Sequence, residues 1–259
     1  AIDVAEAAPA FVVDVGLWVL QLLVLVVGRS AFRRPTRRAL RRGRAGIGVD
    51  DRTQAVELLK RDGGTNLSWM GTWSQNRWYL APGAEGRPLG YQAFQLHSGV
   101  GIGLGDPVGG DVAARRQVLD GFVDSQDAIG QQFCLFSVTQ EVADWATERG
   151  FRTVQVAEEA VIDLPDLEFR GKSWQDVRTA LNRAGKEGIT YREGRLAEMP
   201  RGLQTQVRAI SELWVSDKGL PEMGFTLGGV DEALDPEAMV GLAADADSTV
   251  HGVTSWLPV

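Results

Sequence analysis

A chain of 259 residues with 44% hydrophobic and 24% charged residues has a globular composition and room for one large domain or two small ones. A largely disordered protein is therefore excluded. A single cysteine excludes an intrachain disulfide, and with two histidines the sequence lacks zinc-ligand spacing, so we expect no metal. The net charge of −7 is unevenly divided: residues 1–44 carry eight arginines against three acidic residues, and the remaining chain stands at −12.

The first patterned segment is the apolar run at residues 11–28, which contains one charge, Asp14. At 1.5 Å per residue this helix would cover about 27 Å, close to the ~30 Å core of a bilayer. Arginines follow the run, and because positive flanks stay cytoplasmic, everything after residue 44 is expected in the cytoplasm. We predict a transmembrane helix at 1–28, the last span of a longer membrane region, and a basic juxtamembrane linker at 29–50. A buried core helix followed by a nucleic-acid-binding arm is the alternative.

Residues 51–165 alternate between helical and strand patterns and predict a first folded unit. The expected elements are a helix around 56–59, strands at 77–82, 91–97 and 99–105, a helix at 111–130, a strand at 132–138 and a helix between Thr139 and Gly150. We expect the strand at 132–138 to be buried, with Cys134 as a buried reduced thiol. The alternating glycines at 99–105 match neither a dinucleotide fingerprint nor a phosphate loop, and we favour close packing there.

Residues 166–259 predict a second unit, so the fold class is mixed α/β, of the α+β kind. A strand at 153–164 leads into this unit, two helices follow, and a strand lies at 248–259. We expect the unit to be incomplete, because a buried final strand needs further partners. The first of these helices, at 172–188, has Ser173 as its expected N-cap and Gly188 as its C-terminal stop.

This helix lies in a basic island, since residues 170–208 carry nine basic and four acidic side chains. Arg178, Asn182 and Lys186 repeat every four residues and form one polar stripe, with Arg183 nearby. A solvated helix face would show the same spacing. Within an otherwise acidic domain, the local positive charge favours contact with phosphate, of either a nucleic acid or a lipid.

The stretch KGLPEMGFTLGG, residues 218–229, places Lys218 and Glu222 on either side of Pro221, which prevents the helical geometry of an ion pair. Its glycines allow another chain or a ligand to approach the backbone closely. The stretch is either a charged turn or a loop that holds substrate.

Four motifs in this order, GLGDPVGG, KSWQDVRTALNRAGKEGI, KGLPEMGFTLGG and SWLPV, lie downstream of the predicted span. Together they resemble the cytosolic synthase domain of bacterial phosphatidylglycerol lysyltransferases, also called multiple peptide resistance factors, over residues 50–259. The resemblance implies two acyltransferase units of the GNAT type in tandem. It also implies transfer of an amino acid, usually lysine or alanine, from its tRNA to phosphatidylglycerol, with no cofactor and with aminoacyl-tRNA, anionic phospholipid and the membrane as partners.

The resemblance makes the loop at 218–229 a substrate loop. Glu222 is the candidate proton or amine acceptor, and Lys218 would face a phosphate or the carbonyl oxygen. The candidate substrate-binding residues are Arg178, Asn182, Arg183, Lys186, Phe225 and Asp106. Two alternatives remain: a CoA-dependent N-acetyltransferase, although the pyrophosphate-binding R/Q-x-x-G-x-G/A loop is missing from this sequence, and a non-catalytic membrane-tethered domain that binds tRNA or lipid.

Overall fold

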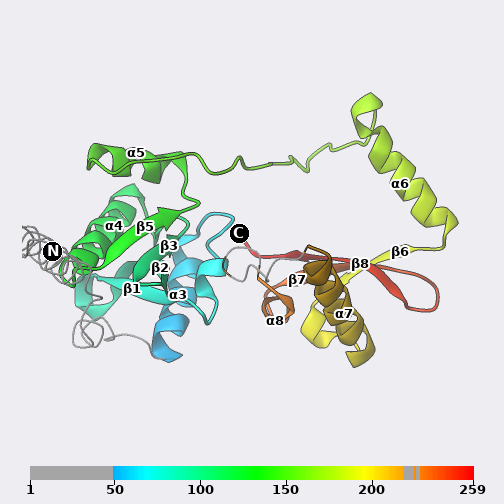
Figure 1. Ribbon diagram of the computed structural model, residues 1–259, viewed down its shortest axis with the longest axis horizontal. Helices are drawn as coiled ribbons and strands as arrows, with labels where there is room; N and C mark the ends of the chain where they lie inside the picture. Colours follow the sequence, from blue (N-terminus) through cyan, green and yellow to red (C-terminus); the bar gives the residue numbers. More distant parts are fainter. Residues whose placement is uncertain (1–48, 219–224, 226–227) are drawn as a thin grey trace, which may run out of the picture.

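The computed structural model describes residues 49–218, 225 and 228–259, and these residues form two sheets with their helices (Figure 1). The predicted membrane span at 11–28, the linker at 29–48 and the catalytic candidate Glu222 lie outside the described residues. Among the residues described, no helix is both long enough and apolar enough to cross a bilayer.

The first sheet has the order β1-β2-β3-β5, with the short β4 paired to β2. The strands and helices of this unit are α3 (Val49–Asp62), β1 (Arg77–Pro82), β2 (Pro88–His97), β3 (Val100–Leu104), β4 (Val108–Gly109), α4 (Val112–Asp127), β5 (Gln132–Phe136) and α5 (Gln140–Glu148). Short 3-10 helices lie at η1 (Met70–Thr72) and η2 (Ala84–Gly86). The pairs among β1, β2 and β3 are antiparallel, whereas β5 joins β3 in parallel.

Successive side chains of a strand point to opposite faces of the sheet, and in this sheet both faces carry apolar side chains. Helices therefore cover both faces. On one face Trp78 and Tyr91 pack against α3 through Ala55 and Leu58. On the other face, the ring of Phe122 from α4 packs against three aromatic rings at 5.4–6.1 Å between centroids. The predicted helices and strands of residues 51–150 are therefore confirmed in type and order.

Two predictions of burial in this unit were wrong, one for Cys134 and one for the strand at 132–138. Cys134 is exposed, and so are both ends of its strand β5. Among the described strands β5 pairs only with β3 and forms an edge of the sheet, and the face that carries Gln132, Cys134 and Phe136 is exposed. The close-packing interpretation of the alternating glycines holds at Gly103, where a Cβ would lie 2.6 Å from Cδ2 of Leu135, but not at Gly99, where a Cβ would meet nothing within 4 Å.

The second sheet is the antiparallel order β6-β7-β8. Its elements are η3 (Lys172–Trp174), α6 (Gln175–Lys186), β6 (Thr190–Gly194), η4 (Leu196–Glu198), α7 (Arg201–Lys218), α8 (Val230–Ala233), β7 (Met239–Ala244) and β8 (Val250–Trp256). Helix α7 covers one face, where Leu196, Val207, Val240 and Leu242 form the core. Strands β6 and β7 were not predicted, because β6 is polar and mostly exposed, and β7 is buried on both faces and so shows no alternation of apolar and polar residues.

The segment between the sheets departs most from the predictions. Residues 153–164 are extended but pair with none of the described strands, so the predicted strand there was wrong. Helix α6 begins at Gln175 after a 3-10 turn, and its N-cap is Trp174, so the capping role predicted for Ser173 was also wrong. Figure 1 shows this segment and α6 as an arm that leaves α5 and returns to β6. Gly188 ends the helix with φ +71°, as predicted.

Candidate active site at the junction of the two sheets

The exit of β3 carries the motif GLGDPVGG and is tied to the end of β5. The Gly105 amide donates to the Phe136 carbonyl at 2.9 Å. The Asp106 carboxylate then accepts two hydrogen bonds from Thr139, from its backbone amide at 2.8 Å and its hydroxyl at 2.6 Å. Asp106, predicted to bind substrate, therefore holds the start of α5 beside the ends of both strands.

Phe225, from the predicted substrate loop, reaches the same place. Its ring lies 6.0 Å from the ring of Phe136, between centroids, at an interplanar angle of 48°. Phe136 is also the acceptor for Gly105, so a single residue of β5 contacts both motifs. The tertiary structure thus brings together two of the predicted substrate-binding residues, Asp106 and Phe225, that are more than a hundred positions apart in the sequence.

The C-terminal end of the loop is docked on the first unit through Gly228. Its φ is +62°, and a Cβ at this position would lie 2.7 Å from Cη2 of Trp73. Only glycine satisfies both the left-handed backbone and the close contact. The end of the loop therefore sits directly against the indole ring of Trp73.

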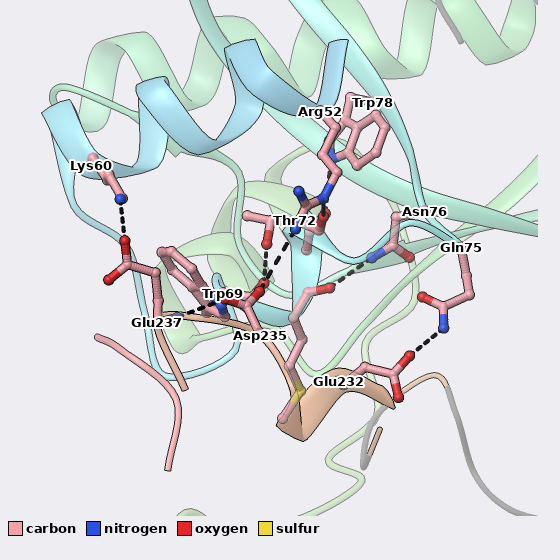
Figure 2. Close-up of polar contacts among 12 residues, drawn as sticks. Arg52, Lys60, Trp69, Thr72, Gln75, Asn76, Trp78, Glu232, Asp235 and Glu237 are labelled. Carbon is pink, nitrogen blue, oxygen red and sulfur yellow. Dashed lines mark hydrogen bonds and ion pairs between the residues drawn. The ribbon is translucent and has the colours of Figure 1, made fainter. Parts of the chain in front are cut away.

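Glu232 reinforces the same docking. One of its carboxylate oxygens accepts from the Gly229 amide at 2.7 Å, as in a capping box at the start of α8. The other accepts from the side-chain amide of Gln75 at 2.5 Å (Figure 2). A single carboxylate thus fixes the loop end and joins it to the first unit.

Two ion pairs join α3 to the segment after α8, as Figure 2 shows. Arg52 lies 3.7 Å from the largely buried carboxylate of Asp235 and also donates to the Thr72 carbonyl at 2.8 Å. Lys60 and Glu237 pair at 2.6 Å at a more exposed position. The Lys60 ammonium lowers the pKa of the Glu237 carboxyl, so this pair persists at neutral pH and is lost only as the pH falls through that lowered value.

The two pairs should differ in their effect on stability. We expect Arg52→Met to lower the free energy of unfolding by about 1–3 kcal/mol, because it removes a donor from Thr72 and the cation facing Asp235. Lys60→Met is the matched control and should cost less than Arg52→Met, because the pair that it breaks is exposed. Urea unfolding of both variants measures the difference, and equal losses would contradict this account.

The motif SWLPV also reaches the junction. Leu257, just after β8, packs against the buried cluster of the first unit that contains Leu58, Trp69 and Val108. Val108 belongs to GLGDPVGG. Three of the four motifs therefore meet where the two sheets join.

A hollow of about 370 Å³ lies between α7 and α8, next to this junction. Its lining includes Glu212, Asp231 and Glu232 with Arg208, which donates to Asp231 at 2.9 Å. The volume is within the range of small-molecule sites. The lining carries three carboxylates and one cation, but Asp231 pairs with Arg208, and Glu232 bonds to Gly229 and Gln75.

The predicted phosphate stripe on α6 is not brought to the junction, since α6 stands apart from both sheets in Figure 1. Arg178 donates to the carbonyls of Phe169 and Gly171 at 2.7 and 2.8 Å, and so holds the turn before the helix. Arg183 pairs with Glu187 at 2.8 Å. Asn182 and Lys186 are exposed. Lys218 is the last residue of α7, one position before the part of the loop that is not described.

The sequence model of a protein family described as "Phosphatidylglycerol lysyltransferase, C-terminal" matches residues 56–259, which include both sheets and their junction. The chain belongs to this family. It is 39% identical over 212 residues to an uncharacterized protein of Corynebacterium glutamicum, covering 81% of this chain and 26% of that protein. It is 25% identical over 221 residues to the lysylphosphatidylglycerol biosynthesis bifunctional protein LysX of Nocardia farcinica, and this match covers 85% of this chain and 19% of LysX.

Among solved structures, the family's fold is seen in L-PGS from Bacillus licheniformis, with a TM-score of 0.69 and 22% identity. The match covers 80% of this chain and 61% of that one. The mixed α/β fold predicted from the sequence is therefore confirmed. This chain spans a fifth to a quarter of the length of the two protein relatives.

Sequence reasoning missed the residues of the first unit that hold the loop. Trp73 and Gln75 lie in the stretch WMGTWSQNRW, where three tryptophans within ten residues could have marked a contact surface. Glu232 stands three residues after Gly229, the spacing of a capping box, and this too could have been noticed. No local pattern indicated that Arg52 would face Asp235.

Proposed function

We propose that the chain carries out aminoacyl-tRNA-dependent transfer of lysine or alanine to a hydroxyl of phosphatidylglycerol, at the cytoplasmic face of the cell membrane. The observation that carries this proposal is the family match over residues 56–259. The relatives that bear functional names point the same way. LysX of Nocardia farcinica is named a lysylphosphatidylglycerol biosynthesis bifunctional protein, and a relative from Staphylococcus xylosus is named phosphatidylglycerol lysyltransferase.

The reaction exchanges one ester for another. The lipid hydroxyl oxygen forms a bond to the carbonyl carbon of the aminoacyl ester, the bond to the tRNA ribose oxygen breaks, and the proton of the lipid hydroxyl ends on that ribose oxygen. The protein must align two anionic substrates, accept and return the proton, and stabilise the oxyanion. In our assignment Glu222 handles the proton or the α-amine, and Lys218 faces the carbonyl oxygen or a phosphate.

The junction supports this assignment because it holds the substrate loop at defined points. Its first residue, Lys218, is the last residue of α7, and Gly228 and Glu232 dock its other end on Trp73 and Gln75. In the same proposal, phosphate is contacted by four residues of α6: Arg178, Asn182, Arg183 and Lys186. The chain is then organised as a membrane helix at 1–28 followed by two tandem GNAT-type units, at residues 51–165 and 166–259.

Lipid extracts of cells that express the full-length gene test the proposal. We expect a new ninhydrin-positive, cationic derivative of phosphatidylglycerol on thin-layer chromatography. In membranes supplied with labelled aminoacyl-tRNA, its formation should stop after ribonuclease treatment. A derivative formed with ribonuclease present would remove the tRNA from the reaction. Absence of any new lipid, with the protein expressed, would favour the non-catalytic tethered domain.

A further inference from the structure

The turn that leads into β1 is held by buried hydrogen bonds. The side chain of Asn76 is buried and donates to the Met70 carbonyl at 2.7 Å. The buried indole of Trp78 donates to the Gly71 carbonyl at 2.8 Å. Because a buried donor that loses its acceptor is strongly unfavourable, these bonds keep the backbone of residues 70–76 in one arrangement. The turn can therefore hold its side chains at a defined place.

Two residues of this turn contact the second unit at the end of the substrate loop. The ring of Trp73 lies so close to Gly228 that a Cβ there would be 2.7 Å from Cη2 of the indole. The side-chain amide of Gln75 donates to Glu232 at 2.5 Å (Figure 2). One contact alone would allow the loop end to turn about it, whereas two contacts, made to residues four positions apart, also fix its direction.

The Glu232 carboxylate connects Gln75 to the backbone of the loop. Its Oε1 accepts from Gln75 and its Oε2 accepts from the Gly229 amide at 2.7 Å, so each oxygen has one of the two donors. The charge of the acceptor makes both hydrogen bonds stronger than bonds between neutral groups. The place of the Gly229 amide therefore depends on a side chain of the first unit.

We propose that Gln75 is a positioning residue for the transfer reaction: through Glu232 it sets the place of the loop backbone at Gly229, and the first unit thereby aligns the substrate loop. This rests on the proposed function, which makes residues 218–229 the substrate loop. Gln75 need not touch either substrate in this role, because a shift of about 1 Å in an aligned group can lower a rate on the order of 100-fold. Its loss should lower kcat, since the residues that bind substrate are unchanged. A Glu232 that only caps α8 would not respond to a change at Gln75.

Exchanging the two side chains tests the contact in the full-length protein. Gln75→Glu sets a second carboxylate against Glu232, and the two like charges repel. Glu232→Gln still offers an acceptor to the Gly229 amide, and the exposed Gln75 side chain can turn over to accept from the new amide, so this change should be mild. The two substitutions together restore one carboxylate and one amide, with the donor now at position 232.

We expect Gln75→Glu to lower kcat for lipid aminoacylation about tenfold or more and to change KM for either substrate less than about threefold. The double variant should return to within about threefold of the parent, because the two sites act through one contact. Gln140→Glu is the matched control and should keep the parental kcat, since Gln140 donates to Asp144 at 2.7 Å and the same repulsion then arises within α5. Equal kcat in the single and double variants, a parental kcat in Gln75→Glu, or a loss confined to KM would overturn the proposal.

Hydrogen exchange of the same proteins reports on the loop end without substrate. We expect the amides of residues 229–234 to exchange several-fold faster in Gln75→Glu and to regain parental protection in the double variant, with α4 unchanged as a measure of the fold. Should α4 lose protection, Gln75→Ser, which removes the contact without adding a charge, takes the place of Gln75→Glu in both measurements. Unaltered exchange at 229–234 would overturn the positioning role alone. The expected exchange with no transfer by the parent would refute the proposed function alone.

Discussion

Replacing Glu222 by Gln should lower the rate of amino-acid transfer to phosphatidylglycerol by about 100-fold or more, because general acid–base assistance is typically worth 10²- to 10⁴-fold. The substitution keeps the size of the side chain and removes its charge and basicity. We expect the free energy of unfolding to change by less than about 0.5 kcal/mol, because the substitution is isosteric. The measurement is the initial rate of lipid aminoacylation by the full-length protein, at matched expression.

Glu148→Gln is the control for this experiment. Glu148 ends α5 in the first unit, and its exposed carboxylate pairs with Arg116 at 3.6 Å, so the same loss of charge occurs away from the junction. We expect transfer by this variant to stay close to that of the parent. Transfer by Glu222→Gln within threefold of the parent would remove Glu222 from the mechanism and return residues 218–229 to a charged turn.

Gly228→Ala should lower both stability and transfer. The left-handed backbone costs about 1–2 kcal/mol for a residue with a Cβ. The contact with Trp73 adds about 1–3 kcal/mol, as overpacking does. Because Trp73 must move, the loop end shifts with it, and a displacement of about 1 Å can cost on the order of 100-fold in rate. Urea unfolding and the lipid transfer assay measure the two effects.

Gly130→Ala separates the backbone effect from the contact. Gly130 has φ +63°, close to the +62° of Gly228, but a Cβ there would meet nothing within 4 Å. We expect this variant to show only the backbone cost and to retain transfer. If the two alanine variants proved equally stable and equally active, the contact between Gly228 and Trp73 would contribute to neither stability nor transfer.

The first unit was the more predictable of the two. Its helices and strands carry strong periodicity and clear ends, such as Gly150 after α5 and the polar Asp111, whose side chain caps α4 by accepting from the Ala114 amide. The second unit was less predictable, since β6 is polar and exposed and β7 is buried on both faces, so neither strand shows alternation. At residues 153–164 the error was the reverse, because a strand was predicted and none is present. The sequence pattern there is that of a strand, but a strand forms only where a partner is available for its backbone groups.

The candidate site divides in the same way. The motifs around Asp106, Lys218, Phe225 and Arg178 are recognisable from residue type and spacing, and so is the loop at 218–229, through its glycines, its proline and its two charges. The roles of Glu222 and Lys218, the membrane helix at 1–28 and the tandem GNAT-type organisation stay predictions. The phosphate stripe on α6 does not lie with the other candidates, because nothing in its spacing specifies where the helix lies.

By itself the sequence determined the mixed α/β class, the family and the residues that bear charge or backbone freedom, because these depend on residue type and short-range spacing. Only the tertiary structure decided that Gly228 needs to be glycine because of Trp73, that Glu232 meets Gln75, and that Arg52 faces Asp235. Each of these pairs is separated by more than 150 positions, and contacts at such separation arise from the packing of whole sheets and helices, which no local pattern encodes.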